Sequence, residues 1–295
     1  MSTLAETKIA PIERPEYERE VVEHSGSGEV ERRLSAWERI SNIDALRRLF
    51  ILLILAIVWE LYARWLNNPL MFPTFSATMS ALVDSVVRGE LLSRILTSIK
   101  ILLMGYGAGV GIAAVLTTIA VSTRIGTDLL STLTAMFNPL PAIALLPLAL
   151  LWFGLGIPSL VFVIVHSVLW AVALNTYTGF LGVSETQRMA GQNYGLRGLR
   201  YVLFILIPAA FPSILAGLKI AWAFAWRTLI AAELVFGVSS GSGGLGWFIF
   251  ENRNLLETAN VFAGLTAVIV IGLLVESVVF RFVEERTVRK WGMQR

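Results

Sequence analysis

Long apolar stretches alternate with shorter polar segments along most of the chain. Each apolar stretch holds about 20 residues, the length that a helix needs to cross the hydrocarbon core of a bilayer. Membrane barrels instead show short strands of alternating polarity. The pattern therefore predicts an all-α polytopic membrane protein with about six transmembrane helices. The predicted spans are residues 49–66, 95–120, 129–153, 159–181, 211–236 and 259–282.

These spans define a transmembrane domain over residues 46–285, between an N-terminal segment 1–45 and a basic C-terminal tail 286–295. Residues 1–28 are polar and lack the apolar core of a signal peptide, so we expect a cytoplasmic tail. Apolar residues then recur every three or four positions over residues 30–46, which predicts an amphipathic helix. This helix lies either along the membrane surface or against the protein as an ordinary solvated helix.

Several segments between the spans are polar or rich in glycine and are expected on the outer side of the membrane. Residues 76–87 predict a short amphipathic helix, and residues 154–158 a tight turn. Residues 237–246 form a Gly/Ser-rich loop, and residues 247–256 predict a short surface helix. These segments would face any partner outside the membrane.

The composition supports a membrane protein and excludes several kinds of chemistry. The 295 residues are 56% hydrophobic and 15% charged, whereas soluble domains carry about 25% charged residues. The absence of cysteine excludes disulfides, thiolate metal sites and cysteine nucleophiles. No phosphate-binding lysine motif and no metal-ligand spacing occurs. We therefore expect no catalytic residue, metal site or cofactor on this chain, and no nucleic-acid partner.

Basic residues are concentrated in alternate segments between the spans. With both termini in the cytoplasm, the inner segments contain Arg47, Arg48, Arg124, Arg188, Arg197, Arg200, Arg286, Arg289 and Lys290. The outer segments contain few basic residues, mainly Arg88 and Arg253. Because cytoplasmic loops carry an excess of lysine and arginine, we expect a multi-pass protein of the bacterial cytoplasmic (inner) membrane with both ends inside. Residues 183–208 then form a cytoplasmic loop.

The third predicted span contains an unusual interruption, Asn138-Pro139-Leu140-Pro141, followed by Pro147. Proline removes a backbone donor and clashes with the preceding turn. Broken helices at membrane depth are tolerated where they face protein or a water-filled path. The interruption is therefore either a lining element of such a path or a kink that fits neighbouring helices.

Other polar side chains fall within the predicted spans. Arg227 and Glu233 lie in the fifth span and His166 in the fourth. Charged residues at membrane depth usually face the bundle interior or a cavity, whereas Lys219 can extend toward the membrane surface. His166 is either a packing residue with satisfied hydrogen bonds or a ligand or proton relay. The candidate path residues are Asn138, His166, Arg227 and Glu233.

Four glycines, Gly105, Gly107, Gly109 and Gly111, alternate within the second span. A phosphate-binding loop would need a following lysine, which is absent. Small residues spaced by four instead favour close helix packing in membranes.

The segment 183–213 is polar at its start and lies between two apolar spans. Arginine at the centre of a membrane helix costs about 2.5–3.5 kcal/mol on insertion scales, and this segment holds Arg188, Arg197 and Arg200. The chain must therefore leave the membrane here, form a short helix and re-enter it.

The spacing of Gly195, Ile205, Ile207 and Pro208 resembles the loop shared by permease subunits of ABC importers. In that family the pattern is Glu-Ala-Ala, three residues, Gly, nine residues, then Ile-x-Leu-Pro. The continuation over residues 208–217 is similar to the nitrate/sulfonate/taurine branch. The wider resemblance covers about residues 92–291 and implies a type I importer permease fold.

One part of the loop departs from the family pattern. Met189, Ala190 and Gly191 occupy the Glu-Ala-Ala positions, and the nearest acid is Glu185, one helical turn earlier. The glycine and proline framework of the loop is retained.

The resemblance implies that a cytoplasmic ATP-binding subunit, which carries ATP and Mg²⁺, binds this loop. It also implies a permease dimer, which we expect to be a homodimer, and an extracytoplasmic substrate-binding protein. The chain itself would not be an enzyme; it would form the path for a small, anionic solute. The residues expected to couple to the ATPase are Glu185, Arg188, Met189, Ala190, Gly191, Tyr194, Gly195, Arg197 and Pro208.

Two alternative functions use other residues. An ion-driven secondary transporter could titrate Glu233, Glu276 and His166. An intramembrane hydrolase could use the G-x-S-x-G pattern at residues 237–241 with His166 as base, although that pattern normally joins a strand to a helix.

Overall fold

A computed structural model describes residues 44–236 and 243–290, and it divides the chain into two compact units, Met1–Leu53 and Ile54–Arg295. All regular structure in the described residues is helical, which confirms the predicted all-α class. Five of the described helices are long and apolar enough to cross a membrane, and a bent pair raises the number to six. The predicted amphipathic helix lies mostly outside the described residues, as do residues 291–295.

The first long helix is α2, Asp44–Leu66, whose residues up to Leu53 are the described part of the first unit. Within the second unit, Trp59 donates to the carbonyl of Pro73 at 3.0 Å and its ring contacts Phe72 and Phe262. Helix α3, Phe75–Val87, follows, with Thr74 as its N-cap. It corresponds to the short amphipathic helix predicted from the sequence.

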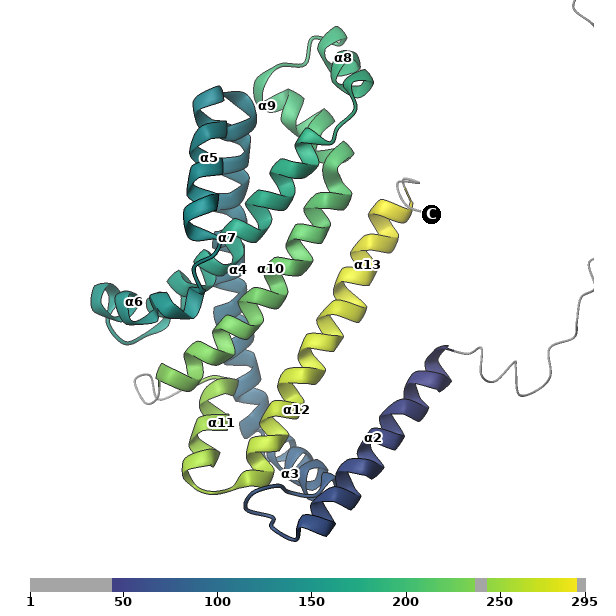
Figure 1. The fold of residues 1–295 in the computed structure, drawn as a ribbon, viewed down its shortest axis with the longest axis vertical. Coiled ribbons are helices and arrows are strands. Elements are labelled where there is room, and N and C mark those ends of the chain that lie inside the picture. Colours follow the sequence, from purple (N-terminus) through teal and green to yellow (C-terminus); the bar gives the residue numbers. More distant parts are fainter. Residues whose placement is uncertain (1–43, 237–242, 291–295) are drawn as a thin grey trace, which may run out of the picture. The chain divides into compact units, whose positions relative to one another are not determined.

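The centre of the second unit is formed by α4 (Glu90–Ser122), α7 (Ile157–Leu181) and α10 (Ile207–Phe236). Helix α7 packs against both others, and its inward residues form much of the hydrophobic core. Figure 1 shows α7 and α10 side by side, with α4 crossing behind them.

Close packing of α4 on α7 depends on two of the four alternating glycines in α4. A Cβ atom on Gly105 would lie 2.6 Å from Ile164, and one on Gly109 would lie 2.8 Å from Val168. Such separations are too short for real carbon atoms, so only glycine permits this approach. Gly107 and Gly111 face open space. The prediction that these glycines serve helix packing is confirmed for Gly105 and Gly109.

The predicted span 129–153 is not one helix. Helix α5 (Arg124–Phe137) is followed by a short 3₁₀ segment, η1 (Ala142–Leu145), and by α6 (Leu146–Phe153). The two arms are bent by 87° at the break. Pro139 and Pro141 lie between them, where each removes a backbone donor that a continuous helix would need. The interruption is therefore a sharp corner rather than a mild kink.

The polar loop contains α8 (Glu185–Asn193) and α9 (Gly198–Tyr201). Helix α9 continues through the π-helical segment η2 (Val202–Leu206) into α10, so the helix that holds the predicted span 211–236 begins at Gly198. Pro208 is the second residue of α10, one turn beyond the centre of the π segment, whose wider turn accommodates a residue that cannot donate a backbone hydrogen bond.

The chain ends with α11 (Leu245–Asn254), α12 (Thr258–Leu274), the π segment η3 (Val275–Phe280), α13 (Arg281–Glu284) and η4 (Glu285–Arg289). The prediction of a surface helix over 247–256 is wrong in one respect. Phe248 and Ile249 of α11 are buried, because this helix packs against α10 and α12.

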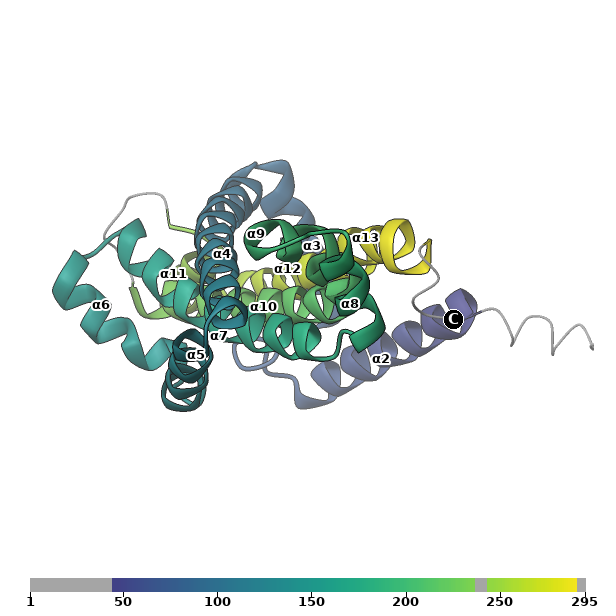
Figure 2. The ribbon, with the colours of Figure 1, turned by 90° about the horizontal axis from the view of Figure 1, so that it is seen from above.

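Two ends of the second unit carry different elements. Helix α8 lies at one end of α7 and α10, whereas α3 and α11 lie at the other (Figure 1). Viewed from above, α8 and α9 lie on one side of α4 and α6 lies on the other (Figure 2). The long helices therefore connect the polar loop to a distant set of short helices.

Candidate functional site

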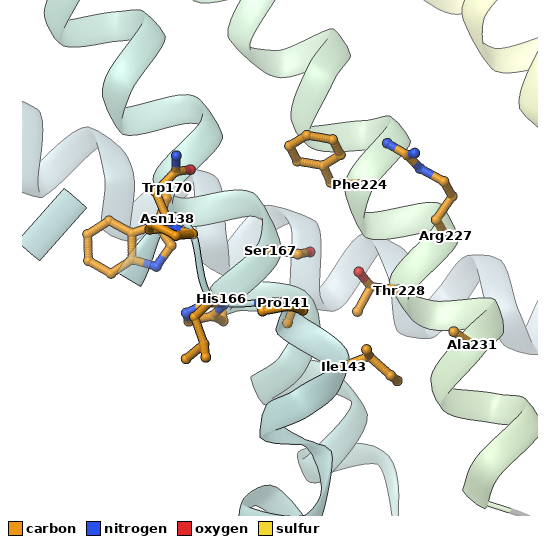
Figure 3. A pocket seen from close by; sticks show the side chains of 13 residues that line it. Asn138, Pro141, Ile143, His166, Ser167, Trp170, Phe224, Arg227, Thr228 and Ala231 are labelled. Atoms are coloured by element: carbon orange, nitrogen blue, oxygen red, sulfur yellow. The ribbon is translucent and has the colours of Figure 1, made fainter. Parts of the chain in front are cut away.

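A cavity of about 410 Å³ lies where the break between α5 and α6 faces α7 and α10. Figure 3 shows side chains from these elements converging on it. The break contributes Asn138, Pro139, Leu140, Pro141, Ala142 and Ile143; α7 contributes His166, Ser167 and Trp170; α10 contributes Phe224, Arg227, Thr228 and Ala231. Three of the four candidate path residues thus meet in one place.

Aromatic rings and unpartnered nitrogens form the α7 wall of the cavity. Trp170, which is 7% exposed, stacks on Phe137 with ring centroids 5.6 Å apart. His166 contacts both rings edge-on. The indole nitrogen of Trp170 and both ring nitrogens of His166 are buried without a hydrogen-bond partner. Buried polar atoms are normally hydrogen-bonded, so the alternative of a packing histidine with satisfied hydrogen bonds is not supported.

Arg227 supplies the positive charge at the α10 wall. Its Nε donates to the carbonyl of Ala223 at 3.1 Å, and its guanidinium lies 5.1 Å from the Phe224 ring (Figure 3). None of the described residues that line the cavity carries a carboxylate. A permanently charged guanidinium in a cavity lining without a carboxylate therefore makes the cavity suitable for an anion.

Glu233 was expected to line the same path, and the structure corrects this. Its carboxylate is 4% exposed and accepts hydrogen bonds from Ser98 at 2.8 and 2.9 Å and from the Gly246 amide at 2.8 Å. The Ser98 hydroxyl in turn accepts from the Leu245 amide at 2.7 Å. Glu233 therefore anchors the first turn of α11, where free backbone amides and the helix dipole favour a negative charge.

A second, smaller cavity of about 180 Å³ lies along another face of α10, between α10 and the last long helix. Lys219, Trp222 and Arg227 of α10 line it, together with Glu276 of η3. Lys219 forms an ion pair with Glu284. In the sequence analysis Glu276 is only a titrating group of an alternative transporter. Its position beside the same cavity as Arg227 depends on how the two helices are aligned, which the sequence pattern does not reveal.

The polar loop forms the other candidate site. Ser184 caps the start of α8, which ends at Asn193 with Tyr194 as its C-cap; the next residue, Gly195, has φ +74°. A left-handed residue at this position closes a helix and turns the chain, and glycine adopts it without a steric penalty. Gly195 therefore turns the chain sharply after the end of α8.

The side chains of the loop divide into an exposed set and an internal set. Tyr194 is 86% exposed and Met189 is 50% exposed, so two apolar side chains project from the end of the unit. Glu185, Ala190 and Arg197 are also exposed.

The internal set holds the loop against the long helices. Arg188 donates to the carbonyls of Phe180 at 2.6 Å and Val183 at 3.1 Å, at the C-terminus of α7. A Cβ atom on Gly191 would lie 2.8 Å from the Ile205 side chain of η2. These two residues, expected to contact a partner, instead fix the orientation of α8.

The sequence pattern does not single out Trp170. It resembles any other apolar residue of a span, and only its unpartnered nitrogen beside the proline break distinguishes it.

No group of histidine and acidic residues in the described ranges could hold a metal ion. The G-x-S-x-G pattern at residues 237–241 lies wholly outside those ranges.

Comparison with known proteins identifies relatives over both sites. Residues 105–290 match the family described as "Binding-protein-dependent transport system inner membrane component". This range includes the cavity and the polar loop.

Three relatives are transport permeases. An aliphatic sulfonates transport permease of Escherichia coli is 28% identical over 221 residues, covering 74% of this chain and 82% of that protein. A taurine transport system permease of the same organism is 33% identical over 141 residues, covering 48% and 50%. A nitrate import permease of Synechocystis is 28% identical over 183 residues, covering 62% and 65%.

Proposed function

Because this chain belongs to the binding-protein-dependent transport system inner membrane component family, we propose that it conducts a small anionic solute across the membrane. The chain is the membrane-spanning permease subunit of an ABC importer, in the branch of its sulfonate, taurine and nitrate relatives. The single observation that carries the anion proposal is Arg227, which lies in a cavity whose described lining has no carboxylate.

The cavity between the broken span, α7 and α10 is the proposed path for the solute. A cavity at a proline break allows irregular backbone at membrane depth to face the path instead of lipid. Arg227 attracts the anion, and the polar side chains of Asn138 and Thr228, which line the same cavity, can donate hydrogen bonds in place of part of its hydration shell.

Transport against a gradient requires energy from another chain. We assign ATP and Mg²⁺ to a separate cytoplasmic ATP-binding subunit that receives α8 in a groove. The exposed side chains of Met189 and Tyr194 would supply the apolar contact, and Glu185 and Arg197 the charges that fix the register. Because Arg188 and Gly191 hold α8 firmly to α7 and η2, motion of the ATPase passes to α7 and α10. Rigid-body movement of these helices would give alternating access.

The same proposal sets the orientation of the chain in the membrane and its other partners. We propose that both termini and α8 are cytoplasmic, and that an external substrate-binding protein meets the opposite end, near residues 154–158 and α11. Arg227 is exposed on its span in the isolated chain. Because an arginine facing lipid is costly, we propose that a second copy of this permease covers that face and completes the path.

The coupling assignment is tested with Gly195→Glu and Arg197→Glu in the assembled importer. Both variants should insert and assemble in the membrane, yet ATP hydrolysis should no longer drive uptake, with the uptake-to-ATP ratio falling at least about tenfold. Arg124→Glu, at the exposed start of α5 and outside the proposed contact residues, is the matched charge reversal and should retain the ratio. Normal uptake by both loop variants would refute the assignment. Uphill transport by the purified chain alone would instead support an ion-driven transporter.

A further inference from the structure

Arg227 lines both cavities, because it lies between two faces of α10. Phe224, Thr228 and Ala231 lie with it along the larger cavity, while Lys219 and Trp222 lie with it along the smaller one. At about 100° per residue, Phe224, Thr228 and Ala231 are turned by about 40–100° to one side of Arg227. Trp222 and Lys219 are turned by about 80–140° to the other side. The Arg227 side chain therefore stands at the edge between the cavities.

The smaller cavity contains one acidic residue that faces α10. Gly272, Glu276 and Phe280 border it at intervals of four residues, so they lie on one face of the last long helix. Glu276 belongs to the π-helical segment Val275–Phe280. Such segments occur frequently at functional sites, because their wider turns allow the register of a helix to change locally.

Of the three charged residues that line the smaller cavity, only Lys219 takes part in an ion pair among the described residues. Lys219 is bound to Glu284, so this cation is already neutralised. Neither Arg227 nor Glu276 takes part in any ion pair formed among the described residues. Arg227 and Glu276 are thus opposite charges that border one cavity within two membrane-spanning segments.

We propose that Glu276 is the internal counter-ion of Arg227 and competes with the transported anion for its guanidinium. When the larger cavity is empty, the guanidinium turns toward Glu276. When an oxyanion enters, it displaces the carboxylate, and Arg227 turns toward the larger cavity. Unpaired charges at membrane depth are expensive. The exchange keeps Arg227 neutralised, and the cost of leaving Glu276 unpaired is part of what the entering oxyanion must overcome.

This arrangement makes Glu276 a specificity-determining residue. An anion must bind Arg227 more strongly than the protein's own carboxylate does, and a neutral or cationic solute cannot displace it. The inference rests on the proposed function, since it assumes that Arg227 meets the solute in the larger cavity.

The test measures binding of methanesulfonate and of nitrate to the importer complex reconstituted in lipid nanodiscs, by intrinsic tryptophan fluorescence. Glu276→Gln should lower the Kd for both anions by about tenfold, a gain equivalent to about 1.4 kcal/mol. Glu276→Asp, which keeps the charge on a shorter side chain, should give an intermediate Kd. Glu285→Gln is the matched control: its carboxylate pairs with Arg281 on the same helix, and its Kd should match that of the wild type.

A double-substitution cycle separates competition from a merely structural effect. Arg227→Gln should weaken anion binding, and adding Glu276→Gln to it should then change the Kd by less than about twofold. An unchanged or higher Kd in both Glu276 variants would overturn the inference while leaving the proposed function intact. Absence of anion binding by the wild type, with normal α8 coupling, would remove the anion site and the inference with it.

Discussion

Ser98 of α4 and Glu233 of α10, 135 residues apart in the sequence, form a buried hydrogen bond of 2.8 Å that positions the start of α11. The serine hydroxyl also receives the Leu245 amide, so two long helices and one short helix meet at a single carboxylate. This contact organises the end of the unit opposite α8, where we expect the binding protein to dock.

Replacing Glu233 should therefore damage stability more than an acidic surface substitution does. Glu233→Ala leaves Ser98 and the Gly246 amide without their acceptor in a buried site, which should cost about 2–4 kcal/mol. Asp84→Ala, at an exposed position of α3, should change stability by less than about 0.5 kcal/mol. Thermal unfolding in one detergent checks both. Equal melting temperatures for the two variants would contradict the anchoring role.

The glycine pairs of α4 offer a second comparison within one helix. Gly105→Ala introduces a Cβ 2.6 Å from Ile164 and should lower stability by about 1–3 kcal/mol. Gly107→Ala meets nothing within 4 Å and should be neutral or stabilising by up to about 1 kcal/mol, because alanine is the better helix former. Equilibrium unfolding in mixed micelles measures the difference. Similar losses at both positions would exclude selective packing through Gly105.

Arg188 should act by holding α8 in place. Arg188→Gln loses the charged hydrogen bonds to the carbonyls of Phe180 and Val183, so amides of α8 should exchange about tenfold faster, as expected for a loss of about 1.4 kcal/mol. Global stability should change little. Hydrogen exchange followed by mass spectrometry reports both properties, with the exposed Arg200→Gln as control. Faster exchange throughout the chain would indicate a general rather than a local role.

The orientation of the chain can be tested directly, because it contains no cysteine. Tyr194→Cys and Leu255→Cys place single thiols at two exposed sites near opposite ends of the second unit. A membrane-impermeant maleimide added to whole cells should label position 255 and leave position 194 unlabelled until the cells are opened. Labelling of position 194 from outside would reverse the proposed topology and remove the ATPase contact.

The sequence by itself determined the helical class, most of the long apolar helices, the polar loop and its glycine turn, and the position of the proline break. These features depend on properties that add up along the chain: hydrophobicity over about 20 residues, the missing amide of proline and the backbone freedom of glycine. They need no knowledge of distant neighbours, and the family resemblance carried by Gly195 and Pro208 is equally local.

Only the tertiary structure decided which polar residue does what. It joined Glu233 to Ser98, turned Arg188 back onto α7, buried one face of α11 and brought Trp170 to the broken span. A side chain's partner depends on the register between helices that lie far apart in the sequence. That register is fixed by close contacts such as Gly109 against Val168, which no pattern of polar and apolar positions specifies.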